Sequence, residues 1–165
     1  MIKKISSIFL LLVIVYVAFF PHFINGSINI ELIFKNDVED RQFLLFFEDL
    51  KVHPSRYPDE SGWILLNFDK RPLDISKPEN MQYLLAKESN LPVGNYDKIS
   101  LRIRSATLEI NQSPVQLQVT GPISIQKSFS VSKESAKTLT LIFEINMENT
   151  VDFKRLDYEV MVQET

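Results

Sequence analysis

Apolar residues recur at every second position over most of this chain, and that alternation restricts its fold more than any other feature. The clearest runs are Ile28–Phe34 and Leu139–Ile145. A period of two is typical of strands that bury one face. About eight or nine such runs follow one another, with turn signals at intervals of roughly ten residues, as in a sandwich. We therefore predict one all-β domain, an antiparallel β-sandwich, over residues 27–165.

Three segments add detail to this prediction. Phe43–Phe47 is apolar at every position, which predicts a central strand covered on both faces. The apolar phase changes within Tyr96–Ile110, so we predict a β-bulge near Arg104-Ser105. Ser76–Glu79 fits a helix-capping box, and we predict one short helix from Ser76 to Asn90.

Residues 1–26 differ from the rest because they hold a basic start and a long apolar run. Lys3 and Lys4 precede Ile8–Phe20, which is 13 apolar or aromatic residues without interruption. As a helix this run spans roughly 20 Å, which is short for a bilayer core of about 30 Å. The run therefore predicts a signal peptide, and the small residues at Gly26-Ser27 predict where it is cut.

The alternative is an uncleaved anchor, with a transmembrane helix extending over Ile5–Ile24. Under either interpretation the lysines stay in the cytoplasm and the domain is exported. We therefore predict an extracytoplasmic protein, which is either secreted or anchored to the membrane by its N-terminal segment.

Composition excludes several classes of site. The chain contains no cysteine, which removes disulfides, thiolate metal sites and cysteine-linked lipid anchors. Without the two leader lysines it has 16 basic against 21 acidic residues, a net charge of −5, which argues against a nucleic-acid partner. There is no glycine-rich phosphate loop and no G-x-S-x-G motif, and we expect no cofactor.

Several motifs, in this order, resemble one known family. They are the V-H-P sequence at Val52–Pro54, the Gly62-Trp63 pair, and the P-x-G-x-Y turn at Pro92–Tyr96 that leads into Ile99–Arg102. Together they resemble the domain of unknown function 4382 family over roughly residues 27–162. The resemblance implies export and a prealbumin-like, immunoglobulin-like sandwich. Family members are often lipoproteins, but this chain lacks the required cysteine, and the family brings no established activity.

Two basic and three aromatic residues are candidate contacts for a ligand or partner. Arg102 and Arg104 alternate with apolar residues and so project from one face, where they form either an anion-binding strip or a solvated surface. Tyr57, Tyr83 and Trp63 have the side chains of a sugar-binding platform. For Trp63, packing in the core is the simpler interpretation.

The remaining polar candidates are a histidine and an acidic turn. His53 ends a strand, and we predict a structural role in which it hydrogen-bonds a loop; a metal ligand or general base is the alternative. Asp37, Glu39 and Asp40 offer oxygen ligands for calcium but lack the spacing of a calcium loop, which favours a solvated turn. We predict no metal site.

These observations predict an exported, non-catalytic cell-surface domain that serves as a binding or assembly module. Its partner would be a cell-surface protein or glycan, contacted by the loop Ser55–Gly62 and the segment Ser76–Asn90. One alternative is a structural subunit of a surface filament or envelope complex, linked by strand addition through Ile28–Phe34. Another is a carbohydrate-active or other hydrolase, which needs two carboxylates facing each other across a pocket.

Overall fold

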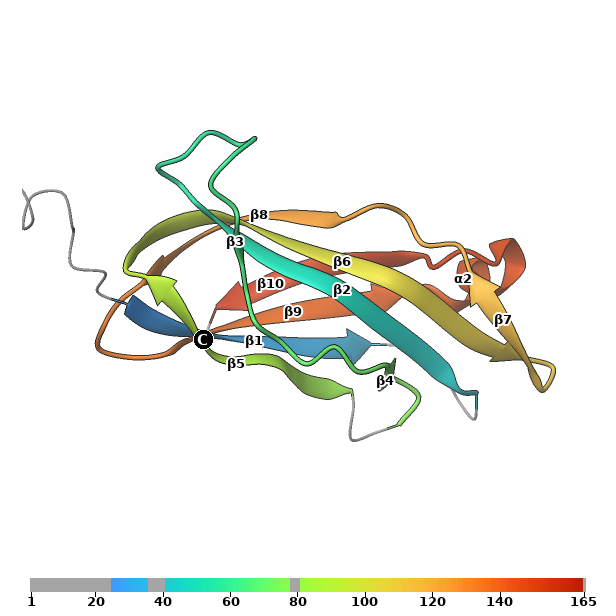
Figure 1. Ribbon diagram of the computed structural model, residues 1–165. Coiled ribbons are helices and arrows are strands. Elements are labelled where there is room, and N and C mark those ends of the chain that lie inside the picture. Colours follow the sequence, from blue (N-terminus) through green and yellow to red (C-terminus); the bar gives the residue numbers. More distant parts are fainter. Residues whose placement is uncertain (1–24, 36–40, 78–80, 165) are drawn as a thin grey trace, which may run out of the picture.

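Two packed β-sheets make up the domain, as the alternation predicts (Figure 1). The computed structural model describes residues 25–35, 41–77 and 81–164. The four-stranded sheet has the order β10-β9-β1-β5. The six-stranded sheet has the order β3-β2-β6-β7, with β4 paired to β2 and β8 paired to β6. The all-β sandwich is confirmed, whereas its prealbumin-like character stays a prediction.

The strands differ widely in length. The four-stranded sheet contains β1 (Asn25–Lys35), β5 (Gln82–Pro92), β9 (Lys137–Ile145) and β10 (Tyr158–Glu164). The other sheet contains β2 (Phe43–Pro54), β3 (Ile64–Leu65), β4 (Leu73–Asp74), β6 (Gly94–Ile110), β7 (Ser113–Leu117) and β8 (Ile123–Val131). β1 and β9 run parallel, while the other pairs of named strands are antiparallel.

The core lies between the sheets and is built from the inward-facing row of each strand. β1 buries every second residue from Gly26 to Phe34. Phe34 meets Phe143 of β9 with ring centroids 5.4 Å apart. β2 is central in its sheet, but it buries only one face in this stretch: Phe43 is fully buried and Leu44 and Phe46 are half-buried. The prediction that Phe43–Phe47 is covered on both faces is therefore only partly correct.

The bulge predicted near Arg104 and Ser105 is confirmed. Phe46 of β2 faces Ser105, and Phe47 faces Ile103, so Arg104 is the extra residue on β6. Such an insertion bends the strand and returns the residues that follow it to the buried phase.

The short helix lies elsewhere than predicted. Residues 82–92 form β5, which pairs with β1, so the prediction of a helix from Ser76 to Asn90 is wrong. Two register shifts between β1 and β5, together with a positive φ of 45° at Glu88, disturb the period of two in this segment. The loss of alternation concealed a strand, and pairing with β1 decides the structure over local helix signals.

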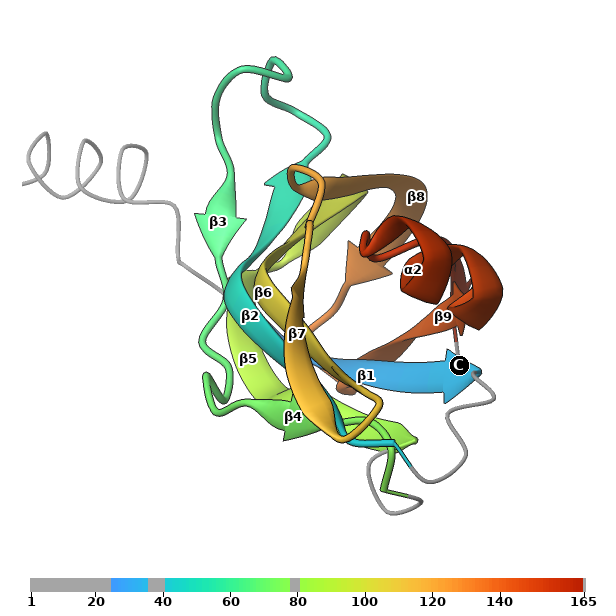
Figure 2. The ribbon, with the colours of Figure 1, turned by 90° about the vertical axis from the view of Figure 1, so that its right-hand side faces the viewer.

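The only helix among the described residues is α2 (Met147–Phe153), which follows β9. The side chain of Asn146 accepts a hydrogen bond from the backbone N–H of Asn149 at 3.0 Å and so caps its first turn. Lys154 ends the helix in a left-handed conformation, with φ 49°. α2 and the turn between β6 and β7 lie at the same end of the sandwich (Figure 2).

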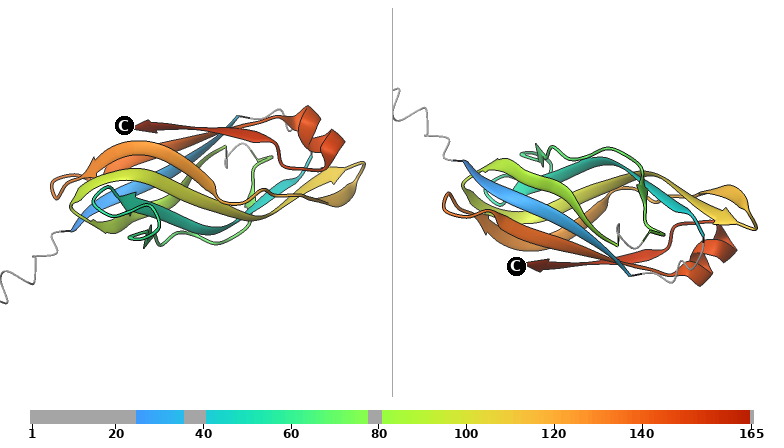
Figure 3. Two further views of the ribbon diagram at one scale, coloured as in Figure 1. Left: turned by 90° about the horizontal axis from the view of Figure 1, so that it is seen from above. Right: turned by 90° about the horizontal axis from the view of Figure 1, so that it is seen from below.

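The opposite end gathers the start of β1, the loop after β2, and the turn between β5 and β6 (Figures 1 and 3). Pairing of Asn25 with Pro92, and of Pro54 with Tyr96, brings these segments together. The predicted cleavage residues Gly26 and Ser27 lie within β1.

The leader's predicted helix and the Asp37-Glu39-Asp40 turn fall outside the described residues. Among the residues that the structure does describe, no helix has the length and apolar character needed to cross a membrane.

β1 occupies the interior of its sheet, which bears on the predicted strand addition. Ile28–Phe34 pairs with β9 on one side, and most of it pairs with β5 on the other. Its backbone groups are therefore used within the same chain, and the segment is not a free strand for a neighbouring subunit in this fold.

We expect Gly26→Ala to destabilise the domain by about 1–3 kcal/mol, the usual cost of overpacking. A Cβ at Gly26 would collide with the carbonyl oxygen of Ser132 and would lie 2.7 Å from Cγ1 of Val131. Gly121→Ala is the matched control, because nothing lies within 4 Å of a Cβ there. Urea unfolding followed by the fluorescence of Trp63, the single tryptophan, measures both. Equal midpoints for the two variants would contradict this packing.

Candidate functional site

His53 is the most deeply buried polar side chain at the end of the domain where β1 begins. Val52 lies in the core, so the next residue points to the outer face of the six-stranded sheet. An outward-facing residue is normally exposed, yet His53 is 0% exposed. The loop after β2 (residues 55–63, the β2–β3 loop) returns over it and excludes water.

Both ring nitrogens of His53 have hydrogen-bond partners. Nδ1 lies 2.7 Å from Oδ1 of Asp97, and Nε2 lies 3.0 Å from the carbonyl oxygen of Pro58. A carbonyl and an ionised carboxylate only accept hydrogen bonds, so both nitrogens must donate, and the ring is an imidazolium. Burial lowers the pKa of His53, but the bonds to Asp97 and Pro58 outweigh it and leave the pKa raised above 6.5.

The Gly62-Trp63 pair completes the cover of His53. Gly62 has a φ of +81°, and a Cβ there would lie 2.6 Å from the Tyr57 ring, so glycine is required on both counts. The indole of Trp63 lies over the imidazole with ring centroids 5.1 Å apart, and its Nε1 donates to the carbonyl oxygen of Asp59 at 3.0 Å. Trp63 is half-buried on the outer face of the sheet, so the prediction that it packs in the core is wrong.

The carboxylate that hydrogen-bonds to His53 belongs to Asp97, the residue that follows the P-x-G-x-Y turn. Gly94 turns the chain with φ +155°, and the hydroxyl of Tyr96 donates to the carbonyl oxygen of Pro92 at 2.7 Å. Asp97 is an extra residue on β6, because Pro54 faces Tyr96 whereas His53 faces Lys98. This bulge turns the Asp97 carboxylate toward the imidazole.

A second ion pair fixes the tip of the loop. Nζ of Lys98 lies 2.5 Å from Oδ1 of Asp59, and this contact holds the pKa of Asp59 below its usual value. The backbone N–H of Ser55 donates to the carbonyl oxygen of Asn95 at 3.0 Å. V-H-P, G-W and P-x-G-x-Y are thus distant in sequence but form one structural unit. We call it the loop end, comprising residues 53–63 and 92–98.

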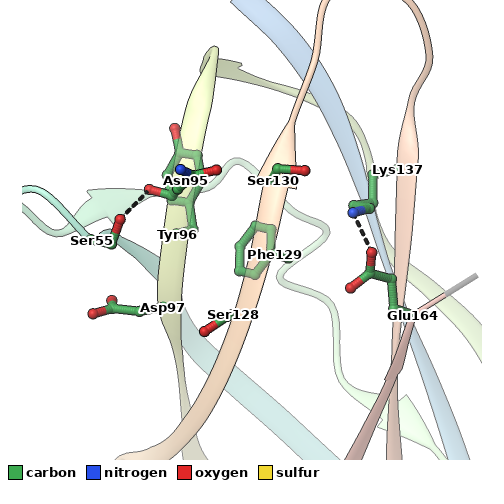
Figure 4. A pocket seen from close by; sticks show the side chains of 9 residues that line it. All are labelled: Ser55, Asn95, Tyr96, Asp97, Ser128, Phe129, Ser130, Lys137 and Glu164. Atoms are coloured by element: carbon green, nitrogen blue, oxygen red, sulfur yellow. Dashed lines mark hydrogen bonds and ion pairs between the residues drawn. The ribbon is translucent and has the colours of Figure 1, made fainter.

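Two hollows flank the contact between Ser55 and Asn95. The smaller has a volume of about 230 Å³ and lies between residues 54–56 and 92–96. The larger, of about 480 Å³, reaches across β8 to Lys137 and Glu164 (Figure 4). Its floor contains Tyr96 and Phe129, whose rings stack with centroids 5.2 Å apart. Serine hydroxyls, an amide and charged groups surround this floor. Such a lining suits a polar ligand that forms many hydrogen bonds.

Two carboxylates are among the residues that line the larger hollow, but they do not face each other as the hydrolase alternative requires, because the Asp97 side chain points away from Glu164 (Figure 4). Asp97 stands on the β6 side and Glu164 on the β10 side (Figure 4). Each already has a charged partner within the chain, since Asp97 is bound to His53 and Glu164 is paired with Lys137. Glycoside hydrolysis needs one carboxyl group protonated as an acid, and a cationic partner opposes that state.

His53, Asp59 and Asp97 also form a group with potential metal ligands, whose nearest atoms lie within 4.8 Å of one another. The 2.7 Å between Nδ1 of His53 and Oδ1 of Asp97 is the length of a charge-assisted hydrogen bond. The ammonium of Lys98 is already bound to Asp59. Positive charge therefore reaches both carboxylates from the protein itself, and we assign the group a structural role.

Arg102 and Arg104, the predicted arginine strip, contact different side chains. Arg102 lies 3.8 Å from Glu48 and 3.7 Å from Asp49, so its charge is compensated locally. Arg104, in the bulge, lies over the ring of Phe46 at 5.4 Å. The two guanidinium groups share the outer face of the sheet, as predicted, but they interact with different side chains.

The two predicted tyrosines belong to different parts of the fold. Tyr57 is 43% exposed in the β2–β3 loop, with the Arg56 guanidinium 4.9 Å above its ring. Tyr83 lies in β5 of the other sheet, and its hydroxyl donates to Asp69 at 3.0 Å. The side chain of Arg71 lowers the pKa of Asp69 to about 2. Tyr83 is thus held in a structural contact, and Tyr57 is the tyrosine that faces solvent at the loop end.

Asp97 and Lys98 have central roles here but were not singled out from the sequence. They follow the P-x-G-x-Y turn as an ordinary acidic and basic pair within a strand. Their importance depends on a bulge and on the pairing of β6 with β2. This pairing brings Asp97 to His53, although the two residues are 44 positions apart in the sequence. The available signal was the loss of alternation between the buried Tyr96 and the buried Ile99.

We expect the free energy of unfolding to fall as the pH rises above about 6.5, the pKa of an ordinary histidine. The pKa of His53 is raised in the folded state, so the native protein binds the proton more tightly than the unfolded chain. This contribution is complete below the unfolded-state pKa and disappears as the pH passes through the folded-state value. Urea unfolding at pH values from 5.5 to 9 (about 0.5 apart) measures it.

Asp97→Asn is the matched variant for this titration, because the amide keeps the shape of the side chain but not its charge. It should cost about 1–3 kcal/mol below pH 6.5 and reduce the fall above that pH. A wild-type stability that rises through this range would contradict the two hydrogen bonds of His53.

Comparison with known proteins gives one match. The family described as "Domain of unknown function (DUF4382)" matches residues 25–154. No curated protein and no solved structure matches the chain. The matched region includes the three motifs that meet around His53, from Val52–Pro54 to Pro92–Tyr96. Because the match extends over most of its length, the chain belongs to the domain of unknown function 4382 family.

Proposed function

We propose that this protein is an exported, non-catalytic binding module whose contact surface is the loop end. The observation that carries the proposal is the pair of hydrogen bonds made by the buried His53, which join the β2–β3 loop to Asp97 on β6 and fix the loop over the outer face of the six-stranded sheet. A loop ordered before binding loses little conformational entropy when a partner arrives. Loops that a rigid scaffold positions are the usual binding elements of such domains.

The exposed side chains of the loop end are the types that dominate binding energy. Tyr57 and Arg56 stack on each other at the loop surface, and Tyr and Arg are enriched among binding hot spots. Val93 in the neighbouring turn is 42% exposed. The two hollows beside them offer hydroxyl, amide and backbone groups. A cell-surface glycan or a polar segment of a surface protein fits this combination.

Binding is favoured over catalysis by the state of the ionisable groups. A general base needs a free lone pair, but both nitrogens of His53 are engaged with acceptors. Asp97, Asp59 and Glu164 each carry a cationic partner. These groups stabilise the loop end and the adjoining strands, and they are not poised to exchange protons with a substrate.

The predicted leader joins the domain at the loop end. β1 begins at Asn25, beside Pro92, so the leader joins the domain at this end. A retained leader would hold the loop end near the membrane, and a cleaved leader would release it. A cut before Ser27 would remove Asn25 and Gly26 from β1. N-terminal sequencing of the protein from fractionated cells distinguishes these cases, and recovery of the intact chain from the cytoplasm would contradict export.

We expect the double substitution Arg56→Ala and Tyr57→Ala to reduce binding at least tenfold while leaving the fold intact. The measurement is binding of the full chain to a glycan array and to envelope proteins of the producing cells. Phe153→Ala is the matched control, because Phe153 is a 69% exposed aromatic residue on α2, at the other end. Unfolding midpoints equal to that of the wild-type chain would show that the loss of binding does not come from unfolding of the variants.

Two outcomes would contradict the proposed contact surface. One is binding that survives the double substitution at the loop end. The other is an equal loss from Phe153→Ala, which would place the contact at the α2 end.

A further inference from the structure

β10 is an edge strand of the four-stranded sheet, and within the described part of the chain only one of its sides is paired. Tyr158–Glu164 pairs with β9 in an unbroken register, from Tyr158 opposite Ile145 to Glu164 opposite Leu139. Figure 3 shows β10 along the outer margin of the molecule. Among the hydrogen bonds of residues 25–35, 41–77 and 81–164, none joins the backbone on its other side. Such a row of free N–H and C=O groups is a template for another strand.

The other edges carry features that hinder pairing. β3 and β4 have only two residues each, and β7 contains Pro114. β8 has a shifted register opposite Tyr96–Lys98 and carries Lys127. β5 is bulged, and the N–H of Asp69 donates to the carbonyl oxygen of Leu85 from outside the sheet. β10 is regular and contains no proline, lysine or bulge, so of the described edges it alone lacks these protections.

We propose that β10 pairs antiparallel with β10 of a second copy of this chain, in a two-fold register centred on Met161. This register uses all seven residues of the strand. On the outer face, Met161 faces the partner's Met161, and Glu159 faces the partner's Gln163. No carboxylate lies opposite another carboxylate on this face, and a glutamine amide can donate to each glutamate.

The inner face is also self-complementary. Val160 and Val162 are half-buried at the margin of the core, and in this register Val160 faces the partner's Val162. Pairing removes this remaining apolar surface from water. Glu164 faces the partner's Tyr158, while its charge is balanced by Lys137 of its own chain. The two four-stranded sheets then form one continuous sheet.

Other two-fold registers are less favourable. Centring on Glu159 places two carboxylates directly opposite each other, which is destabilising. Centring on Val160 or Val162 shortens the paired segment and leaves residues at one end of the strand unpaired. The complementarity therefore favours Met161 as the centre. This dimer uses none of the loop-end residues 53–63 and 92–98, although Glu164 of β10 also lines the larger hollow, and its test is independent of any ligand.

The absence of cysteine from the chain allows a direct test by single substitutions. In the full-length chain, Met161→Cys should form a disulfide-linked dimer on mild oxidation in cells. Directly opposed residues have Cα atoms about 4.5–5.5 Å apart, which is within disulfide range. Glu159→Cys alone should not cross-link, because four residues separate the two copies of position 159 by about 13 Å. Coexpressed Glu159→Cys and Gln163→Cys chains should cross-link with each other.

Two controls complete the experiment. Leu65→Cys, at a 58% exposed position on β3, reports random collision and should remain monomeric. Met161→Lys, a change at a 48% exposed position, should abolish the dimer in sedimentation of the otherwise unmodified chain without shifting its unfolding midpoint. Failure of Met161→Cys to cross-link would overturn the proposal. Equal cross-linking by Glu159→Cys alone or by Leu65→Cys would overturn it as well.

Discussion

The buried imidazolium of His53 is the interaction on which the loop end depends. Its two ring nitrogens join the carboxylate of Asp97 on β6 to the carbonyl of Pro58 in the β2–β3 loop. A buried charge is costly unless it is paired and hydrogen-bonded, and here both conditions are met. Trp63 closes the site from above, and Gly62 permits the turn that brings it there. If any of these groups were lost, the charge would be left without a partner or open to water.

The alternating pattern predicted the sandwich because each strand buries one face, and that information is local. It predicted the bulge at Arg104 for the same reason, since a change of phase is visible in the sequence. It failed for β5, where two register shifts remove the alternation and the sequence Ser76–Glu79 fits a capping box. A hydrogen bond from His53 to a loop was predicted, but its carboxylate partner could not be, because Asp97 reaches the ring only through strand pairing and a bulge.

The two ends and the edge of the sandwich have separate roles in this account. The loop end holds exposed Tyr57 and Val93 beside two hollows and is the proposed contact surface. The β10 edge is the proposed self-association surface; it shares no residue with the segments 53–63 and 92–98, but its Glu164 borders the larger hollow. A module that dimerises through β10 presents two copies of the loop end, and two linked sites bind a repeated surface partner more tightly than one.

The most direct test of the role of His53 is its titration by nuclear magnetic resonance in the ¹⁵N-labelled full chain. His22, the only other histidine, is replaced by glutamine to remove its signal. Burial alone would lower the pKa of His53, whereas its bonds to Asp97 and Pro58 raise it. The account predicts a pKa above 6.5, with protons on both Nδ1 and Nε2 below it. A pKa below 6.5, or a neutral ring with one bare nitrogen at pH 6, would contradict it.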